Sequence, residues 1–145
     1  QVENVIQALK HRAPTSLSRM VDLGSGDGRI VVAAAKAGYK GTGVELNHWL
    51  NVYANISAMR AGVGSDTRFL TTDLWKIDYK QYDAVVIFGV AEMMEELSSK
   101  LQEKLKPGSR IIACRFDIPD LEPVYVVGEG FDTTWVYEIP YPKLK

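Results

Sequence analysis

Residues 20–28 join a short apolar segment to a glycine-rich turn that carries carboxylates. The stretch reads MVDLGSGDG, with Asp22 two positions before the first glycine. A strand that reverses into a helix within a few residues, while its backbone approaches a ligand closely, needs residues without a Cβ atom. The stretch therefore predicts a strand, a tight turn and a helix start that together face a bound nucleoside.

The spacing of the glycines argues against a dinucleotide. In the dinucleotide fingerprint two residues separate the second and third glycines, but here Gly28 comes one position early and Arg29 stands in its place. Asp22 and Asp27 would also repel a pyrophosphate. S-adenosyl-L-methionine (SAM) has no phosphate, and carboxylates tolerate its sulfonium and ammonium groups. We therefore interpret the turn as part of a SAM site; the alternative is an ordinary tight turn.

Two further carboxylates lie at predicted strand ends. Glu45 lies near the end of segment 41–46, from where an acidic side chain can accept hydrogen bonds from both ribose hydroxyls. Asp73 follows segment 68–70 and can accept from the adenine amine, while Leu74 offers a backbone N–H and an apolar surface to the ring. The alternatives are a solvated strand-end charge for Glu45 and a helix cap for Asp73. Three sites at three successive strand ends are more specific than any one of them.

The acceptor side is less distinctive. Methyl transfer from a sulfonium depends on alignment and exclusion of water more than on acid or base catalysis. A lysine acceptor must lose its proton first, and a desolvating aromatic pocket lowers its pKa. Phe88 and Gly89 can supply such a wall, although Phe88 also fits a core position. The Asn/Asp-Pro-Pro-Tyr/Phe motif of many amino-group methyltransferases is absent, which argues against an adenine base or glutamine as acceptor.

The hydrophobic pattern predicts alternating strands and helices. We expect Asn47 to cap a helix whose buried face carries Leu50, Tyr53, Ala54, Ala58 and Ala61. We expect strands near residues 20–23, 41–46, 68–70, 84–90, 111–116, 124–127 and 134–138, and helices near 2–11, 28–37, 48–61 and 92–106.

Seven strands, the first five linked by helical crossovers, predict an α/β fold: a doubly wound, Rossmann-like sheet between two helical layers. Such sheets bind ligands outside the carboxyl ends of their strands. The glycine turn, Glu45, Asp73 and Phe88 should therefore meet along one rim, although they lie far apart in the sequence.

Composition limits the class of protein. With 145 residues and 46% hydrophobic content, the chain can bury one core, so we expect a single domain over 1–145. The net charge of −1 argues against a nucleic-acid partner. Cys114 fits a small buried strand residue, and with His11 and His48 as the only histidines we expect no metal site. The sequence has no apolar run long enough to span a membrane. Because it starts at Gln1, already in a helical pattern, we expect a fragment of a longer chain.

Beyond these motifs, blocks along nearly the whole chain closely resemble the mitochondrial protein-lysine methyltransferases of the ATP synthase c-subunit and adenine nucleotide translocase type. Some of them, such as Asp73–Lys76 and Ala113–Phe116, are specific to that family and not general to SAM folds. The resembling blocks are 1–5, 21–31, 45–47, 49–50, 73–76, 85–90, 112–116 and 128–132.

The resemblance implies a seven-strand fold, SAM as methyl donor with S-adenosyl-L-homocysteine as product, and a lysine ε-amine acceptor on a protein of the mitochondrial inner membrane. It implies membrane contact through an N-terminal segment that this chain lacks, and we expect a monomer. Carried onto this sequence, the SAM contacts are Asp22, Gly24, Ser25, Gly26, Glu45, Asp73 and Leu74. The acceptor channel is implied for Phe88, Gly89 and Trp135, of which Trp135 also fits a core position.

Two other functions stay open at this stage. One is a methyltransferase of a small molecule or nucleic acid on the same fold. The other is a non-catalytic module that keeps the SAM pocket without turnover, because methyl transfer requires no unmistakable catalytic side chain.

Overall fold

The computed structural model describes residues 1–11, 19–88, 91–119 and 121–140, and this part of the chain contains a seven-stranded sheet of order β3-β2-β1-β4-β5-β7-β6. β1 to β5 run parallel, whereas β7 is antiparallel to both β5 and β6. The strands are β1 (Arg19–Leu23), β2 (Lys40–Val44), β3 (Thr67–Leu70), β4 (Ala84–Phe88), β5 (Arg110–Cys114), β6 (Tyr125–Val127) and β7 (Thr134–Glu138).

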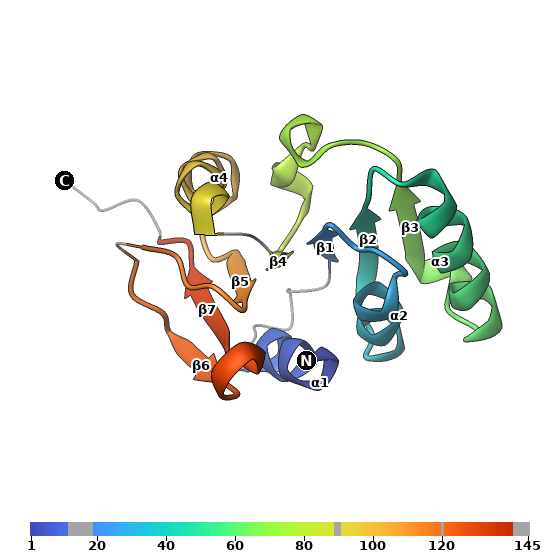
Figure 1. The fold of residues 1–145 in the computed structure, drawn as a ribbon, viewed down its shortest axis with the longest axis horizontal. Helices are drawn as coiled ribbons and strands as arrows, with labels where there is room; N and C mark the ends of the chain where they lie inside the picture. Colours follow the sequence, from blue (N-terminus) through green and yellow to red (C-terminus); the bar gives the residue numbers. More distant parts are fainter. Residues whose placement is uncertain (12–18, 89–90, 120, 141–145) are drawn as a thin grey trace.

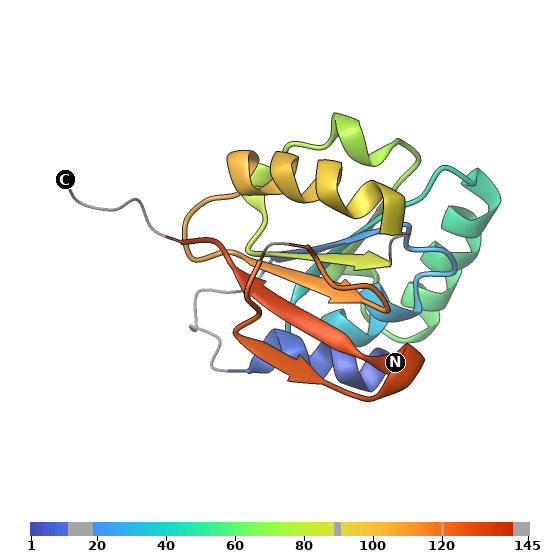
Figure 2. The same ribbon diagram turned by 60° about the vertical axis from the view of Figure 1, so that its left-hand side comes forward.

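Helices cover both faces of this sheet, which confirms the expected doubly wound, Rossmann-like α/β fold (Figures 1 and 2). They are α1 (Val2–Lys10), α2 (Arg29–Lys36), α3 (His48–Arg60) and α4 (Ala91–Lys104). Figure 2 shows α4 on one side of the sheet and α1 on the other. The strand order reverses between β1 and β4, the position at which such sheets bind ligands. None of the described helices is both long enough and apolar enough to cross a bilayer.

The connection from β3 to β4 differs from the expected helical crossover. Residues 71–83 are all described, and they form only two short 3-10 turns, η2 (Leu74–Lys76) and η3 (Tyr79–Gln81). The carboxylates of Asp73 and Asp78 cap these turns by accepting from Trp75 N and Lys80 N. Such caps favour tight turns over a continuous helix. The expectation of α-helical crossovers between all of the first five strands is therefore wrong at this one.

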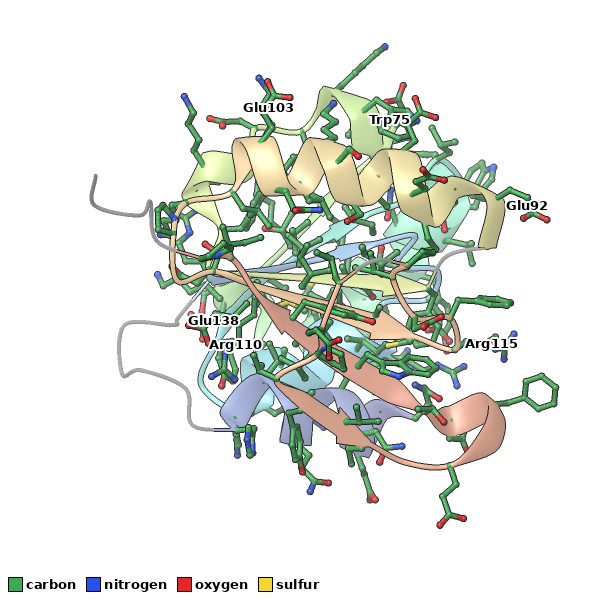
Figure 3. All side chains as sticks on the ribbon, turned by 90° about the vertical axis from the view of Figure 1, so that its left-hand side faces the viewer. Trp75, Glu92, Glu103, Arg110, Arg115 and Glu138 are labelled. Carbon is green, nitrogen blue, oxygen red and sulfur yellow. The ribbon has the colours of Figure 1, made fainter. Side chains whose placement is uncertain are left out.

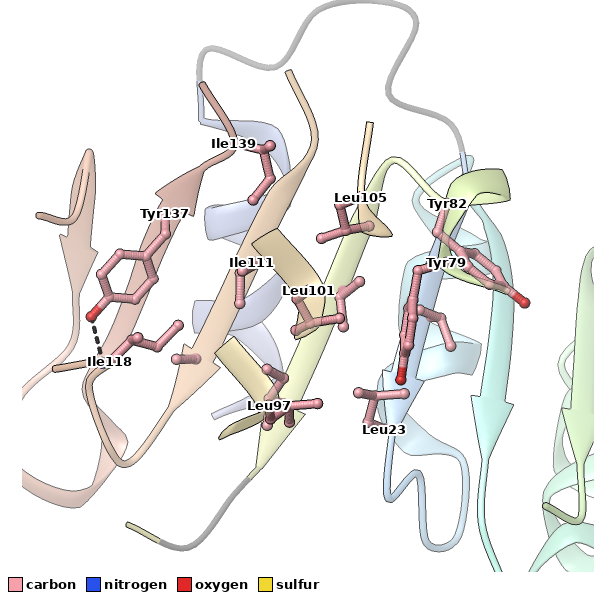
Figure 4. Close-up of a cluster of buried hydrophobic side chains, with 14 of the residues drawn as sticks. Leu23, Tyr79, Tyr82, Leu97, Leu101, Leu105, Ile111, Ile118, Tyr137 and Ile139 are labelled. Atoms are coloured by element: carbon pink, nitrogen blue, oxygen red, sulfur yellow. Dashed lines mark hydrogen bonds between the residues drawn. The ribbon is translucent and has the colours of Figure 1, made fainter. Parts of the chain in front are cut away.

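A buried cluster fills the space between the sheet and α4 (Figure 4). Leu97 and Leu101 of α4 pack there with the aromatic rings of Tyr79 and Tyr82 and the strand residue Leu23. On the opposite face, a second cluster joins α1 and α2 to Met20, Val86 and Ile112 of the strands. Cys114 lies fully buried in this second layer, as expected, and burial raises the pKa of its thiol to about 12.

Helix α3 begins as predicted but packs differently. The Asn47 side chain accepts from Trp49 N and Leu50 N, so the expected cap is confirmed. Its inner face is built from small residues, with Ala54 and Ala58 fully buried. Tyr53, expected on that face, is instead 59% exposed. The prediction is wrong because α3 itself carries apolar residues on all of its sides, so their periodicity does not indicate which side is buried.

The small residues of α3 allow it to lie close to Gly28, the residue before α2. Gly28 has φ +82°, and a Cβ atom there would come within 2.7 Å of Ala54 Cβ and 2.9 Å of Phe69 Cε1. The third glycine of the turn therefore serves close helix packing. Gly24 and Gly26 also have positive φ, but a Cβ atom on either would meet nothing within 4 Å.

We expect Gly28→Ala to lower the free energy of unfolding by about 2 to 4 kcal/mol, the sum of a left-handed backbone penalty and overpacking. Gly62→Ala is the matched control, because Gly62 has φ +77° with nothing within 4 Å of its Cβ position, and it should cost only about 1 to 2 kcal/mol. Urea titrations of both variants measure the difference, and equal losses would contradict the packing role of Gly28.

Candidate functional site

The glycine turn sits directly on the carboxyl end of β2. The backbone N–H groups of Gly24 and Ser25 both donate to the Val44 carbonyl, at 2.8 and 3.0 Å. Gly43 makes this contact possible, because a Cβ atom there would lie 2.6 Å from Ser25 Oγ. Gly43 was not among the predicted site residues, although a glycine within a buried strand often marks such a close approach.

Next to this contact the structure forms a cavity of about 220 Å³. It brings together Gly24, Glu45, Asp73 and Leu74, four of the predicted contacts, from the ends of three strands. Its lining is completed by Val44, Leu46, Thr72 and Trp75. The cavity thus has two carboxylates on a mainly apolar wall, which suits a flat ring with polar substituents.

Glu45 holds two parts of the rim together. Its Oε1 accepts from Gly26 N at 3.2 Å, and its Oε2 accepts from Asn47 N at 2.9 Å. Each carboxylate oxygen can accept a second hydrogen bond. Glu45 can therefore keep the glycine turn in place and still accept from a ligand hydroxyl.

Asp73 takes the capping role that was its alternative interpretation, and this leaves one oxygen available. Its Oδ1 accepts from Trp75 N at 2.9 Å, which is the cap of η2. Its Oδ2 is 3.9 Å from Lys76 Nζ, too far for a hydrogen bond. Capping fixes the direction of the carboxylate at the cavity wall and does not exclude a contact with an amine.

Asn51 is a positioning residue that the sequence analysis missed. It is almost fully buried in α3, and its Nδ2 donates both to the Glu45 carbonyl, at 3.1 Å, and to Thr71 Oγ1, at 2.9 Å. It therefore ties the segment after β2 to the segment after β3. A polar residue in line with Ala54 and Ala58 was the available signal, because a buried amide requires partners.

The cavity wall formed by Leu74 and Trp75 is held in place by Tyr79 and by Lys100 of α4. The buried Tyr79 donates its hydroxyl proton to the Leu74 carbonyl at 2.5 Å, and burial raises the pKa of this phenol. Lys100 of α4 donates to the Trp75 carbonyl and places its ammonium 5.3 Å from the centre of the indole ring. Figure 3 shows Trp75 beside α4. No local pattern in the sequence indicated either contact, because both join segments that only the fold brings together.

Three buried acceptor oxygens around the rim have no hydrogen-bond partner within the described ranges. They are Asp22 Oδ1, Ser25 Oγ and Asn51 Oδ1. Burial, followed by the nearby charge of Glu45, raises the pKa of Asp22 to about 8. A bound group that brings N–H or O–H donors and positive charge would satisfy such atoms.

Asp27 differs from Asp22 in its surroundings. Its carboxylate pairs with Arg29 at 2.7 Å, and the hydrogen bonds from that guanidinium lower its pKa. It lines a groove between α2 and α3 and not the cavity at the rim. Because the raised pKa of Asp22 keeps its carboxyl largely protonated at neutral pH, repulsion of a pyrophosphate depends on Glu45 and Asp73.

The predicted acceptor residues are not all together. Phe88, at the end of β4, is 39% exposed, so it is not a core residue. Trp135 is half-buried, packs against the α4-side cluster and pairs with Ala113, whereas Phe88 pairs with Cys114, so the two side chains point to opposite sheet faces. Gly89 lies outside the described residues.

Backbone strain marks the same edge of the sheet. Arg115, which follows β5, has φ +76°, the only positive value among the described residues other than glycine. Figure 3 shows it at the opposite end of β5 from Arg110. Its guanidinium carbon is 5.9 Å from the centre of the exposed Phe131 ring. Strained residues concentrate at functional sites, and Arg115 directly follows Cys114, the strand partner of Phe88.

The raised pKa of Asp22 predicts a pH-dependent stability. Well below the ordinary pKa of 3.8 the carboxyl is protonated in both states, but as the pH rises towards 8 the unfolded chain ionises while the folded chain keeps its proton. The free energy of unfolding should therefore fall over this window, and Asp22→Asn should remove that fall. The variant should gain on the order of 5 kcal/mol over the wild type by pH 8 and less than about 1 kcal/mol at pH 4.

Denaturant titrations at pH 4, 6 and 8 measure this difference. Asp27→Asn is the matched control, because its carboxyl has a lowered pKa and its replacement should bring no gain as the pH rises. Parallel pH profiles for wild type and Asp22→Asn would show that Asp22 titrates normally.

Comparison with known proteins identifies the family. The family described as ANTKMT methyltransferase domain matches residues 22–125. The ATP synthase c-subunit lysine N-methyltransferase of Rattus norvegicus is 50% identical over 139 residues, which cover 96% of this chain and 62% of that protein. The adenine nucleotide translocase lysine N-methyltransferase of Mus musculus is 42% identical over 140 residues, covering 96% of this chain and 59% of that protein.

A solved structure extends the likeness to three dimensions. An RNA methyltransferase from Salinibacter ruber in complex with S-adenosyl-L-homocysteine superposes with a TM-score of 0.87 and 30% identity, covering 99% of this chain and 93% of that one. This chain spans about three fifths of the length of the rat and mouse proteins. The family match, which extends from Asp22 in the first strand to Tyr125, shows that the chain belongs to the ANTKMT methyltransferase domain family.

Proposed function

We propose that this chain is the catalytic part of a SAM-dependent protein-lysine N-methyltransferase. The observation that carries the proposal is a grouping at one rim of the glycine turn, Glu45, Asp73 and three buried oxygens that find no hydrogen-bond partner among the described residues. Relatives that are 50% and 42% identical over almost the whole chain are named as lysine methyltransferases. The fold alone would not carry the proposal, because one fold hosts many functions.

The residues at the rim fit SAM in charge and in donor pattern. When bound, SAM supplies a methyl group on a positively charged sulfonium. Glu45 would accept from the ribose hydroxyls, and Asp73 from the adenine amine, with Leu74 against the ring. Gly24 and Gly26 would leave room for close approach, since a Cβ atom on either meets nothing within 4 Å. Asp22 and Ser25 would complete the contacts, each with a buried oxygen that lacks a partner in the described part.

On the acceptor side, the chain would orient an uncharged lysine amine and keep water away. Phe88, Gly89 and Trp135 remain the proposed residues of this channel. Phe88 is favoured because its ring is accessible, and Trp135 is the weaker proposal because its side chain points to the opposite sheet face. Phe116, also exposed and one residue beyond the strained Arg115, would extend the aromatic wall. An aromatic surrounding disfavours the ammonium form, so the lysine would give up its proton to solvent as it enters.

The proposed substrate is a lysine on an inner-membrane protein of mitochondria, of the ATP synthase c-subunit or adenine nucleotide translocase type. The higher identity to the c-subunit enzyme, 50% against 42%, favours the c-subunit. We further propose that the chain acts as a monomer on a membrane-embedded protein and that its domain spans 1–145.

We expect Glu45→Ala to weaken SAM binding by about 10- to 100-fold, the loss for hydrogen bonds to a charged group. Asp27→Ala is the matched control: it removes a carboxylate next to the same turn that does not line the cavity, and it should leave the affinity unchanged. Isothermal titration calorimetry measures both. An unchanged affinity for Glu45→Ala would remove this residue from the ribose role.

The activity itself is tested by incubating the protein with SAM and purified c-subunit or translocase, followed by mass spectrometry. A gain of about 14 Da per methyl group on a lysine is expected, with a preference for the c-subunit. SAM binding without methylation of either protein would instead favour the non-catalytic module.

An RNA methyltransferase is the second candidate, favoured by the close structural match to the Salinibacter ruber protein. The net charge of −1 argues against it, because binding to a phosphate backbone relies on basic patches. Adding RNA to the same assay separates the two, since methyl groups would then appear on RNA and not on lysine.

A further inference from the structure

Helix α3 exposes a continuous stripe of large apolar side chains, which we call the α3 outer face and define as Trp49, Val52, Tyr53, Ile56 and Met59. All five are exposed, Trp49 at 78% and Met59 at 72%. Their spacing of three and four residues places them on one side of the helix. The opposite side packs inward through Asn51, Ala54 and Ala58.

This arrangement is the reverse of an ordinary surface helix, which buries its large apolar residues and exposes charged ones. A helix that is apolar on all sides is normally covered on all sides. Here α3 lies beyond β3 at the edge of the molecule, and no other helix lies outside it in the described part of the chain (Figure 1). The fold therefore needs only the inner face of α3 and leaves the outer face for something else.

The helix and the groove beside it carry net positive charge. From Leu46 to Ser65 the sequence contains no carboxylate, and its one charged side chain, Arg60, lies on the outer side of the helix. The neighbouring α2 contributes Lys36, which lines a groove of about 460 Å³ together with Tyr53. The same groove holds the ion pair between Asp27 and Arg29, whose charges balance each other. Neither Lys36 nor Arg60 forms an ion pair within the described ranges.

We propose that the α3 outer face docks on an anionic lipid surface, with the helix lying flat in the headgroup region. Trp and Tyr are the side chains that prefer this interface, and Lys and Arg beside an apolar face add attraction to anionic lipids. At 13 residues the helix is about 20 Å long, so it rests on a bilayer and does not cross it. Protein interfaces also favour Trp, Tyr and Met, but the lack of any carboxylate in the sequence of α3 and the basic residues beside its apolar face favour an anionic lipid surface.

Docking would bring the 220 Å³ cavity at the rim, the proposed SAM site, close to the membrane. Leu46, which is 70% exposed, lies directly before the cap of α3 and also lines the cavity. The outer face and the site rim are therefore continuous. That docking would orient the rim towards lysines near a bilayer surface rests on the proposed function. Lipid binding by the α3 outer face does not rest on it.

The test is sedimentation of the 145-residue chain with sucrose-loaded vesicles of phosphatidylcholine alone or mixed in equal parts with phosphatidylglycerol. Binding is expected for the mixed vesicles and should be weaker for phosphatidylcholine alone. The double variant Trp49→Gln, Ile56→Gln should bind at least about tenfold more weakly, and both substitutions keep good helix propensity. Lys36→Gln with Arg60→Gln should reduce the preference for the anionic vesicles.

Val126→Gln is the matched control, because Val126 is 47% exposed on β6, at the opposite edge of the sheet from β3. It should bind vesicles like the wild type, and thermal melts should show all three glutamine variants folded. No binding by the wild type, or equal binding by the double variant, would overturn the proposal. So would a wild-type dimer in sedimentation velocity that the double variant abolishes, because a second copy would then cover the face.

Titration of the same samples with SAM in the absence of lipid keeps this test separate from the proposed function. Lipid binding with no SAM binding would leave the docking face standing and remove the methyltransferase. SAM binding with no lipid binding would do the reverse.

Discussion

The whole site depends on the contact between the turn after β1 and the last carbonyl of β2. Two backbone N–H groups converge on Val44, and they reach it only because Gly43 has no side chain to displace Ser25. Further hydrogen bonds connect this contact to the next two strand ends. The Glu45 carboxylate accepts from the glycine turn and from Asn47 N at the start of α3. The Asn51 side chain of α3 donates to the Glu45 carbonyl and to Thr71 Oγ1 after β3. Three strand ends are thus fixed relative to one another by groups that all lie at one edge.

This edge carries buried polarity that a stable core would avoid. A buried acceptor without a partner costs free energy, and a buried carboxyl is driven towards its protonated form. Asp22, Ser25 and Asn51 each have such an oxygen within the described residues, close to the turn that brings them together. Such unpaired oxygens are explained if a ligand supplies their hydrogen bonds. The free energy lost in the unliganded protein is then recovered only with a ligand that has donors at the matching positions.

Sequence reasoning reached the fold and the meeting of Glu45 and Asp73 because parallel strands place their carboxyl ends together. It did not reach Asn51, Tyr79 or Lys100, since each acts through a partner distant in sequence or through a backbone carbonyl that only folding makes accessible. The predicted helical crossover between β3 and β4 was wrong because the side chains of Asp73 and Asp78 cap short turns there. The predicted burial of Tyr53 was wrong because α3 carries apolar residues on all of its sides.

The inner and outer faces of α3 are subject to different structural constraints. The inner face must be small, because Gly28 and the strand end of β3 approach it closely, and it must contain one amide to join Glu45 to Thr71. Neither requirement applies to Trp49 or Ile56, which are 78% and 46% exposed. Polar residues there would serve folding and solubility better. An apolar outer face on the helix that begins beside the cavity is therefore best explained as a contact surface, and the proposed lipid docking would place that cavity beside a bilayer.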